Sequence, residues 1–172
     1  EFGTFNVVIP NASSTAEVLY QWIADSKIVE WDETLSTYLY TGILTDTGGF
    51  RHSNTTADVL RIAAQLVESG ASAHEIAEQA LEATSLTQIR CLEQALSMLQ
   101  ISSDGRVAWL SLSLDQQKQI QATDADVEGI VDIPRKIIGV EVGIFFRETP
   151  EGTIRVSFRS KKYVDVSKIA FS

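Results

Sequence analysis

The chain has 172 residues, of which 44% are hydrophobic and 22% charged, and its formal net charge at pH 7 is −9. This length allows one ordinary domain or two small ones, and no apolar run approaches the roughly 20 residues that a membrane-spanning helix needs. The negative charge argues against binding of long double-stranded DNA, which requires a basic face. It leaves room for a local basic pocket that binds a short anionic ligand.

The first half of the chain has a helical pattern. Ser14 and Glu17 have the spacing of a capping box, and an apolar stripe with helical periodicity follows them. The paired glycines Gly48 and Gly49 are expected to end a later helix, because glycine permits backbone angles that stop helices. The predicted helices begin at Ser14, at Asp32 or Thr34, at Asn54 or Thr55, at Ser72 and at about Leu86, and the last runs to Leu99.

The second half has the pattern of strands. Residues 107–114 and 138–146 alternate in polarity, and residues 149–152 (Thr-Pro-Glu-Gly) predict the turn of a hairpin. On the return strand the alternation places Arg155, Ser157 and Arg159 on one face. The two halves together predict an α+β fold of the α/β type, with a mixed sheet and helices in the second half.

Cys91 is the single cysteine, which excludes an internal disulfide and a multi-cysteine metal site. It lies in an apolar helical pattern that is typical of a buried thiol. Because reducing compartments keep thiols free, a cytoplasmic location is expected.

Two places in the sequence are candidates for chemistry. Asp46 is expected at a helix end before glycines, where a carboxylate either reaches into a cleft or merely caps a turn. His52 lies close to it in the sequence, whereas His74 has the pattern of a surface residue.

The second candidate is the cluster Ser157, Arg159 and Ser160. An arginine fork and a hydroxyl suit phosphate oxygens, but such an arginine can equally lie on the solvent face of a sheet. Arg155, Lys161 and Lys162 are interpreted as surface residues.

The string around Asp46, Thr-Gly-Ile-Leu-Thr-Asp-Thr-Gly-Gly-Phe at residues 41–50, resembles the last metal-binding motif of the DHH phosphoesterases. Residues 12–17 and 53–55 are similar to its flanking segments in the oligoribonuclease (nanoRNase) and pAp phosphatase branch. Residues 128–131, 139–142 and 156–160 are similar to successive landmarks of the DHHA1 domain. Several matches in the right order are more specific than any one of them.

The resemblance implies three segments: the C-terminal part of a metal-binding DHH domain (residues 1–83), a connector helix (84–99) and a truncated DHHA1 substrate-binding domain (100–172). It implies two manganese ions that activate water, with Asp46 as a catalytic metal ligand. It also implies substrate binding by Arg159, Ser157, Ser160 and His52.

The family's other metal-binding motifs, including Asp-His-His itself, and its Gly-Gly-Gly-His loop are absent from the sequence. The resemblance therefore implies a fragment that is not competent alone and does not bind the manganese pair. For the intact protein it implies a phosphoesterase that acts on oligoribonucleotides or 3′-phosphoadenosine 5′-phosphate (pAp). A cyclic-dinucleotide phosphodiesterase and a non-catalytic nucleotide-binding module stay open as alternatives. The expected partner is short RNA or a nucleotide. Association with a membrane is not expected, and formation of a homodimer is left open.

Overall fold

The structure is a computed structural model that describes residues 3–4, 6–26 and 29–170. They fold into two compact units, Glu1–Ala83 and Thr84–Ser172. The described residues comprise helices and one four-stranded mixed sheet, which confirms the predicted α+β class. None of the helices in this described part is long and apolar enough to span a membrane. The assignment of the units to a metal-binding and a substrate-binding domain stays a prediction.

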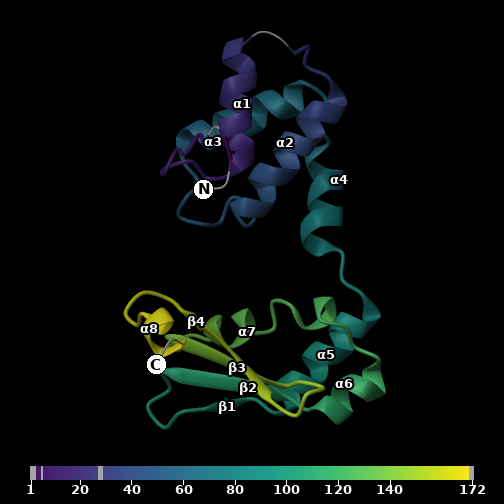
Figure 1. Cartoon of the computed structure of the whole chain (residues 1–172), viewed down its shortest axis with the longest axis vertical. Helices are drawn as coiled ribbons and strands as arrows, with labels where there is room; N and C mark the ends of the chain where they lie inside the picture. Colours follow the sequence, from purple (N-terminus) through teal and green to yellow (C-terminus); the bar gives the residue numbers. More distant parts are fainter. Residues whose placement is uncertain (1–2, 5, 27–28, 171–172) are drawn as a thin grey trace. The chain divides into compact units, whose positions relative to one another are not determined.

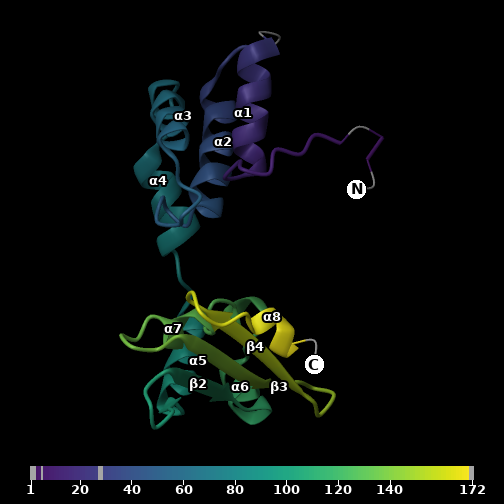
Figure 2. The same ribbon diagram turned by 90° about the vertical axis from the view of Figure 1, so that its left-hand side faces the viewer.

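The first unit is helical, and its core lies where α2 contacts α1, α3 and α4 (Figures 1 and 2). Ile43 and Leu66 are fully buried in this core. The α2 helix begins after Asp32, whose carboxylate accepts a hydrogen bond from the backbone N–H of Leu35 at 2.7 Å. The helices are α1 (Thr15–Ser26), α2 (Glu33–Asp46), α3 (Ala57–Glu68) and α4 (Ala73–Ala77), and α4 continues into the π-helical turn η1 (Glu78–Glu82).

The second unit is a sheet in the order β1-β2-β3-β4, with helices packed against it (Figure 1). The central pair, β2 and β3, is parallel, and the two outer pairs are antiparallel. A parallel pair needs a crossover connection, which α6, η2 and α7 supply here. The elements are α5 (Leu86–Ser97), β1 (Gln100–Ile101), β2 (Val107–Leu112), α6 (Leu114–Ile120), the 3₁₀ turn η2 (Ala125–Val127), α7 (Asp132–Arg135), β3 (Val142–Glu148), β4 (Ile154–Ser160) and α8 (Val166–Ala170).

One face of this sheet forms the core of the second unit. Leu110 of β2 lies opposite Phe145 of β3, and both are buried. Cys91 and Ala95 of α5, both fully buried, pack into the same core. The helix predicted as a connector is therefore an integral part of the second unit, because its small buried side chains let it lie close to the sheet.

The strand predicted over residues 138–146 is displaced toward the C-terminus. Ile138 is 99% exposed, and β3 begins only at Val142. The preceding residues form α7 and a turn in which Gly139 has a φ of +92°. Gly143 of β3 lets α7 approach closely, because a Cβ at this position would lie 3.1 Å from the backbone N of Arg135. The alternating sequence pattern thus extended beyond the part of the segment that pairs with other strands.

Candidate functional site

Asp46 is the last residue of α2 in the first unit, and it is exposed. After Thr47 the chain makes a left-handed turn, with φ values of +58° at Gly48, +68° at Gly49 and +61° at Phe50. Two glycines adopt these angles with little cost, whereas Phe50 is strained there. The Thr47 hydroxyl stabilises the turn, since it donates to the Ile43 carbonyl at 2.7 Å and accepts from the Phe50 N–H at 3.1 Å.

The loop after this turn is tied back to its surroundings by Asn54. Its amide donates to the carbonyl oxygens of Asp46 at 3.2 Å and Ser13 at 3.0 Å. Asn54 or Thr55 was predicted as the cap of this helix, but Thr56 caps α3 instead, and its hydroxyl accepts from the Val59 N–H at 3.2 Å. Asn54 therefore joins the end of α2 to the start of α1, which fixes the backbone that carries Asp46.

His52 is exposed in the same loop as Asp46. Its imidazole lies against the backbone of Gly48, where a Cβ would be 2.4 Å from the His52 Nε2. His74 is exposed on α4. No group of three or more His, Cys, Asp or Glu side chains in the described residues is arranged to hold a metal ion. Asp46 is an oxygen ligand that suits manganese, but it does not form a metal centre with its described neighbours.

The second unit contains a pocket of about 430 Å³ against β3 and β4. This volume lies within the usual range for small-molecule sites. Its location follows from the sheet register, because Phe145 lies opposite Ser157 and Arg147 lies opposite Arg155. Side chains of directly opposed residues project to the same face of a sheet. The lining residues are Asp124, Ala125, Val127, Glu128, Gly129, Val131, Phe145, Arg147, Arg155, Ser157 and Arg159.

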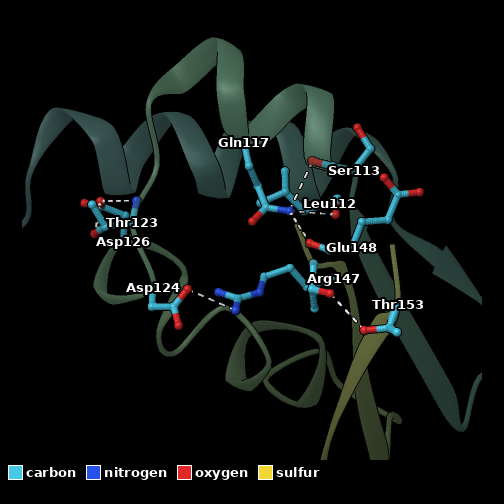
Figure 3. A network of polar contacts seen from close by, with 10 residues as sticks. Leu112, Ser113, Gln117, Thr123, Asp124, Asp126, Arg147, Glu148 and Thr153 are labelled. Carbon is cyan, nitrogen blue, oxygen red and sulfur yellow. Dashed lines mark hydrogen bonds and ion pairs between the residues drawn. The ribbon is translucent and has the colours of Figure 1, made fainter. Parts of the chain in front are cut away.

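Two of the three arginines in this pocket contact acidic side chains. The Arg147 side chain is only 10% exposed, and its Nη2 lies 3.1 Å from Asp124 Oδ1 (Figure 3). The Arg159 side chain is 53% exposed, and its Nε lies 3.7 Å from Asp132 Oδ1. Asp132 also accepts a hydrogen bond from Arg135 at 3.0 Å, so Arg159 shares this carboxylate. Arg159 is therefore the more accessible of the two and can turn toward a ligand.

The loop on the acidic side of the pocket is held by Asp126. Its carboxylate accepts hydrogen bonds from the N–H of Thr123 at 2.9 Å, the hydroxyl of Thr123 at 2.6 Å and the hydroxyl of Ser85 at 3.2 Å. The Thr123 hydroxyl, the Thr123 N–H and the Ser85 hydroxyl lower the pKa of Asp126 below its ordinary value. Figure 3 shows this contact beside the Asp124–Arg147 pair. The negative rim of the pocket is thus positioned by fixed hydrogen bonds.

A second set of hydrogen bonds, made by Gln117, holds the end of β3. The side-chain amide of Gln117 in α6 donates to the carbonyl oxygens of Glu148 at 2.8 Å and Ser113 at 3.2 Å (Figure 3). Glu148 follows Arg147 directly, so this contact fixes the strand end that carries the buried arginine. This contact therefore helps to position the strand end from which Arg147 enters the pocket.

The predicted substrate residues divide between two units and two sheet faces. Ser157 and Arg159 line the pocket, whereas Ser160 pairs with Val142 on the opposite face of the sheet. His52 and Asp46 lie in the first unit. Sequence reasoning did not assign Arg147 and took Arg155 for a surface residue. The sequence does contain a signal for their pairing, because both arginines are placed symmetrically about the turn predicted at residues 149–152.

No protein-family model matches the chain. The bifunctional oligoribonuclease and PAP phosphatase NrnA of Thermus thermophilus is 34% identical over 98% of this chain and 50% of its own length. The probable NrnA of Streptococcus mutans is 30% identical over 95% of the chain and 52% of its own length. The predicted resemblance to the DHH phosphoesterase family is confirmed.

The NrnA of Bacillus subtilis is 28% identical over 93% of the chain and 51% of its own length. A crystal structure of an exopolyphosphatase-related protein from Bacteroides fragilis is similar with a TM-score of 0.88 and 28% identity, over 99% of this chain and 50% of that one. The chain thus spans about half the length of the curated relatives that it matches.

Proposed function

We propose that this chain is part of a DHH-family phosphoesterase that hydrolyses oligoribonucleotides and pAp, and that its second unit binds the phosphate of the substrate. The observation that carries this proposal is the pocket in which Ser157 and Arg159 face the same space. The names of three relatives, which describe oligoribonuclease and PAP phosphatase activity, support the substrate class.

In this proposal Arg159 and Ser157 bind one phosphate group. A guanidinium presents two parallel N–H donors that match two phosphate oxygens, and such charge-assisted bonds are about twice as strong as neutral ones. Ser157 adds a hydroxyl donor from the middle of the same strand face. Neither contact requires a metal ion, so this phosphate contact belongs to the second unit alone.

We assign Asp46 as one oxygen ligand of a manganese pair, and we keep His52 as a proposed substrate-binding residue of the first unit. The described residues do not complete a two-metal centre, which would need further carboxylates or histidines to offset the repulsion of two cations. The 172-residue chain alone is therefore expected to bind manganese weakly and to lack turnover. A cytoplasmic location and a homodimer stay predictions.

A non-catalytic nucleotide-binding module is the second candidate function. It is favoured by the contrast between the formed pocket and the incomplete set of metal ligands among the described residues. A cyclic-dinucleotide phosphodiesterase would use the same pocket, and it differs only in the substrate that is hydrolysed.

The test is manganese-dependent hydrolysis of pAp and short RNA by the natural polypeptide that contains these residues. Asp46→Asn should lower turnover by about 100-fold or more, because changing even an outer-shell partner of a metal costs 10–100-fold. The melting temperature of this variant should be unchanged, since the Asp46 side chain is exposed. Asp25→Asn, at an exposed position of α1, is the matched control and should keep normal turnover.

Three outcomes separate the candidates. Near-normal turnover of Asp46→Asn at saturating manganese would reject the role of Asp46. Binding of pAp without any hydrolysis by the unaltered polypeptide would favour the non-catalytic module. Hydrolysis of cyclic di-AMP in preference to pAp and short RNA would favour the cyclic-dinucleotide phosphodiesterase.

A further inference from the structure

Arg147 and Arg155 lie directly opposite each other across the β3–β4 hairpin and line the same pocket. Opposed residues of an antiparallel pair have Cβ atoms about 5 Å apart, and like charges in this arrangement are destabilising. The chain has a formal net charge of −9, yet it gathers these two arginines and Arg159 at one pocket. The lining also contains the carboxylates of Asp124 and Glu128, so the guanidinium groups exceed the carboxylates by one, and a bound anion would relieve the remaining repulsion between the opposed arginines.

The protein itself compensates these two charges only in part. Arg147 is paired with Asp124, whose side chain is 85% exposed and therefore exchanges readily with water or another anion. Arg155 has no side-chain hydrogen bond or ion pair among the residues that the structure describes, and it is exposed. A guanidinium has five N–H donors, so both arginines retain donors for a ligand.

This pair is separate from the predicted phosphate site on the same strand. Arg155 and Arg159 are four residues apart, which corresponds to about 13 Å along a strand, and Ser157 lies between them. The face thus has a guanidinium at each end of β4, with the buried guanidinium of Arg147 reinforcing one end. One phosphate held by Ser157 and Arg159 would leave the other end uncompensated.

We propose that Arg147 and Arg155 form a second phosphate-binding position in this pocket, which holds another phosphate group of the same nucleotide. The inference rests on the proposed nucleotide-binding function and deepens it. It assigns the pocket to nucleotides with two separated phosphates, such as a nucleoside bisphosphate or a dinucleotide. In the absence of a ligand, the Asp124 carboxylate pairs with the Arg147 guanidinium. The incoming phosphate replaces this carboxylate.

The experiment is calorimetric titration of the 172-residue chain with pAp, adenosine 5′-monophosphate and adenosine 3′-monophosphate. The buffer contains a chelator that removes divalent metal ions. The unaltered chain should bind pAp about tenfold more tightly than either monophosphate, the effect of one added charge-assisted contact. Arg155→Gln should remove most of this advantage and leave at least one monophosphate unaffected. Arg90→Gln, at an exposed position of α5, removes the same charge outside the pocket and should change nothing.

A second variant tests the exchange at Arg147 without truncating that buried side chain. Asp124→Asn removes the competing carboxylate, so we expect pAp to bind a few-fold more tightly. The melting temperature without ligand should fall, because Arg147 loses its partner. A role of Asp124 in structure alone would lower the melting temperature and leave the affinity for pAp unchanged, which would contradict the inference.

The outcomes also separate this inference from the proposed function. Equal binding of pAp and both monophosphates, unaffected by Arg155→Gln, would overturn the second phosphate position and leave the nucleotide site intact. Equal weakening of all three ligands by Arg155→Gln would likewise overturn it, since one shared position would then suffice. Failure of the folded chain to bind any of the three nucleotides would reject the proposed function together with the inference.

Discussion

The two units present their candidate residues in contrasting ways. The first unit offers one candidate metal ligand, the exposed carboxylate of Asp46, at the end of a helix and before a left-handed turn. The second gathers three arginines and Ser157 in one pocket against a hairpin. A phosphate site can be formed by one hairpin and the loop that covers it, because strand register brings its side chains together. A metal pair needs ligands from several segments, and the described residues supply one recognisable member.

The largest effect expected from a change outside the pocket concerns Gly143, which lies opposite Arg159 in the sheet. An added Cβ would lie 3.1 Å from the Arg135 N and from the Val131 carbonyl oxygen. These are backbone atoms, so α7 must shift, and overpacking of this kind costs about 1–3 kcal/mol. We expect Gly143→Ala to lower the free energy of unfolding of the second unit by this amount. Hydrogen exchange resolved by unit would measure it.

The matched change in the first unit is Gly48→Ala. The atoms nearest to its Cβ would be the outer ring atoms of the exposed His52 side chain, which can turn away, so the main cost is the strain of a positive φ, about 1 kcal/mol. Exchange should then increase around Asp46 and stay unchanged in the second unit. Equal destabilisation of both units by either variant would show that they do not fold independently.

A smaller effect is expected at Glu141, which is 7% exposed and holds the segment after β4. Its Oε1 accepts hydrogen bonds from the N–H groups of Lys162 and Tyr163, both at 2.6 Å. These bonds lower the pKa of the Glu141 carboxyl below its ordinary value of 4.5. The carboxylate therefore stabilises the folded state above about pH 4.5, and this contribution is lost as the pH falls through the lowered folded-state pKa.

Glu141→Gln should accordingly lower the melting temperature at pH 7, and the difference from the unaltered chain should shrink on acidification. Glu93→Gln, at an exposed position of α5, serves as the control and should show no such pH dependence. A melting difference that stays constant from pH 7 to strongly acidic conditions would mean that the hydrogen bonds of Glu141 do not depend on its charge.

Sequence patterns located most of the elements because helix caps and strand alternation are local signals. The hairpin is the clearest case: alternation placed Arg155, Ser157 and Arg159 on one face, and all three line the pocket. Alternation extended the β3 prediction back to Ile138, since the pattern does not reveal where strand pairing begins.

The pocket itself was not predictable residue by residue. Arg147 becomes a pocket residue only through its register with Arg155, and Asp124 only because the loop of Asp126 folds over the sheet. Ser160 was grouped with Arg159 by sequence proximity, but adjacent residues of a strand face opposite sides. Only the position of Asp124 depends on contacts distant in the sequence, whereas the register of Arg147 and the face of Ser160 follow from the hairpin and its alternation.

The most direct test of the central claim is a calorimetric titration of the 172-residue chain with pAp, in a buffer that contains a chelator. The titration is repeated for the variants Arg159→Gln and Asp46→Asn. The claim is that the second unit binds the nucleotide phosphate without metal ions. It predicts binding of one pAp per chain, weakened about tenfold or more by Arg159→Gln and unchanged by Asp46→Asn. Binding that appears only after manganese is added, and that Asp46→Asn abolishes while Arg159→Gln does not, would contradict the claim.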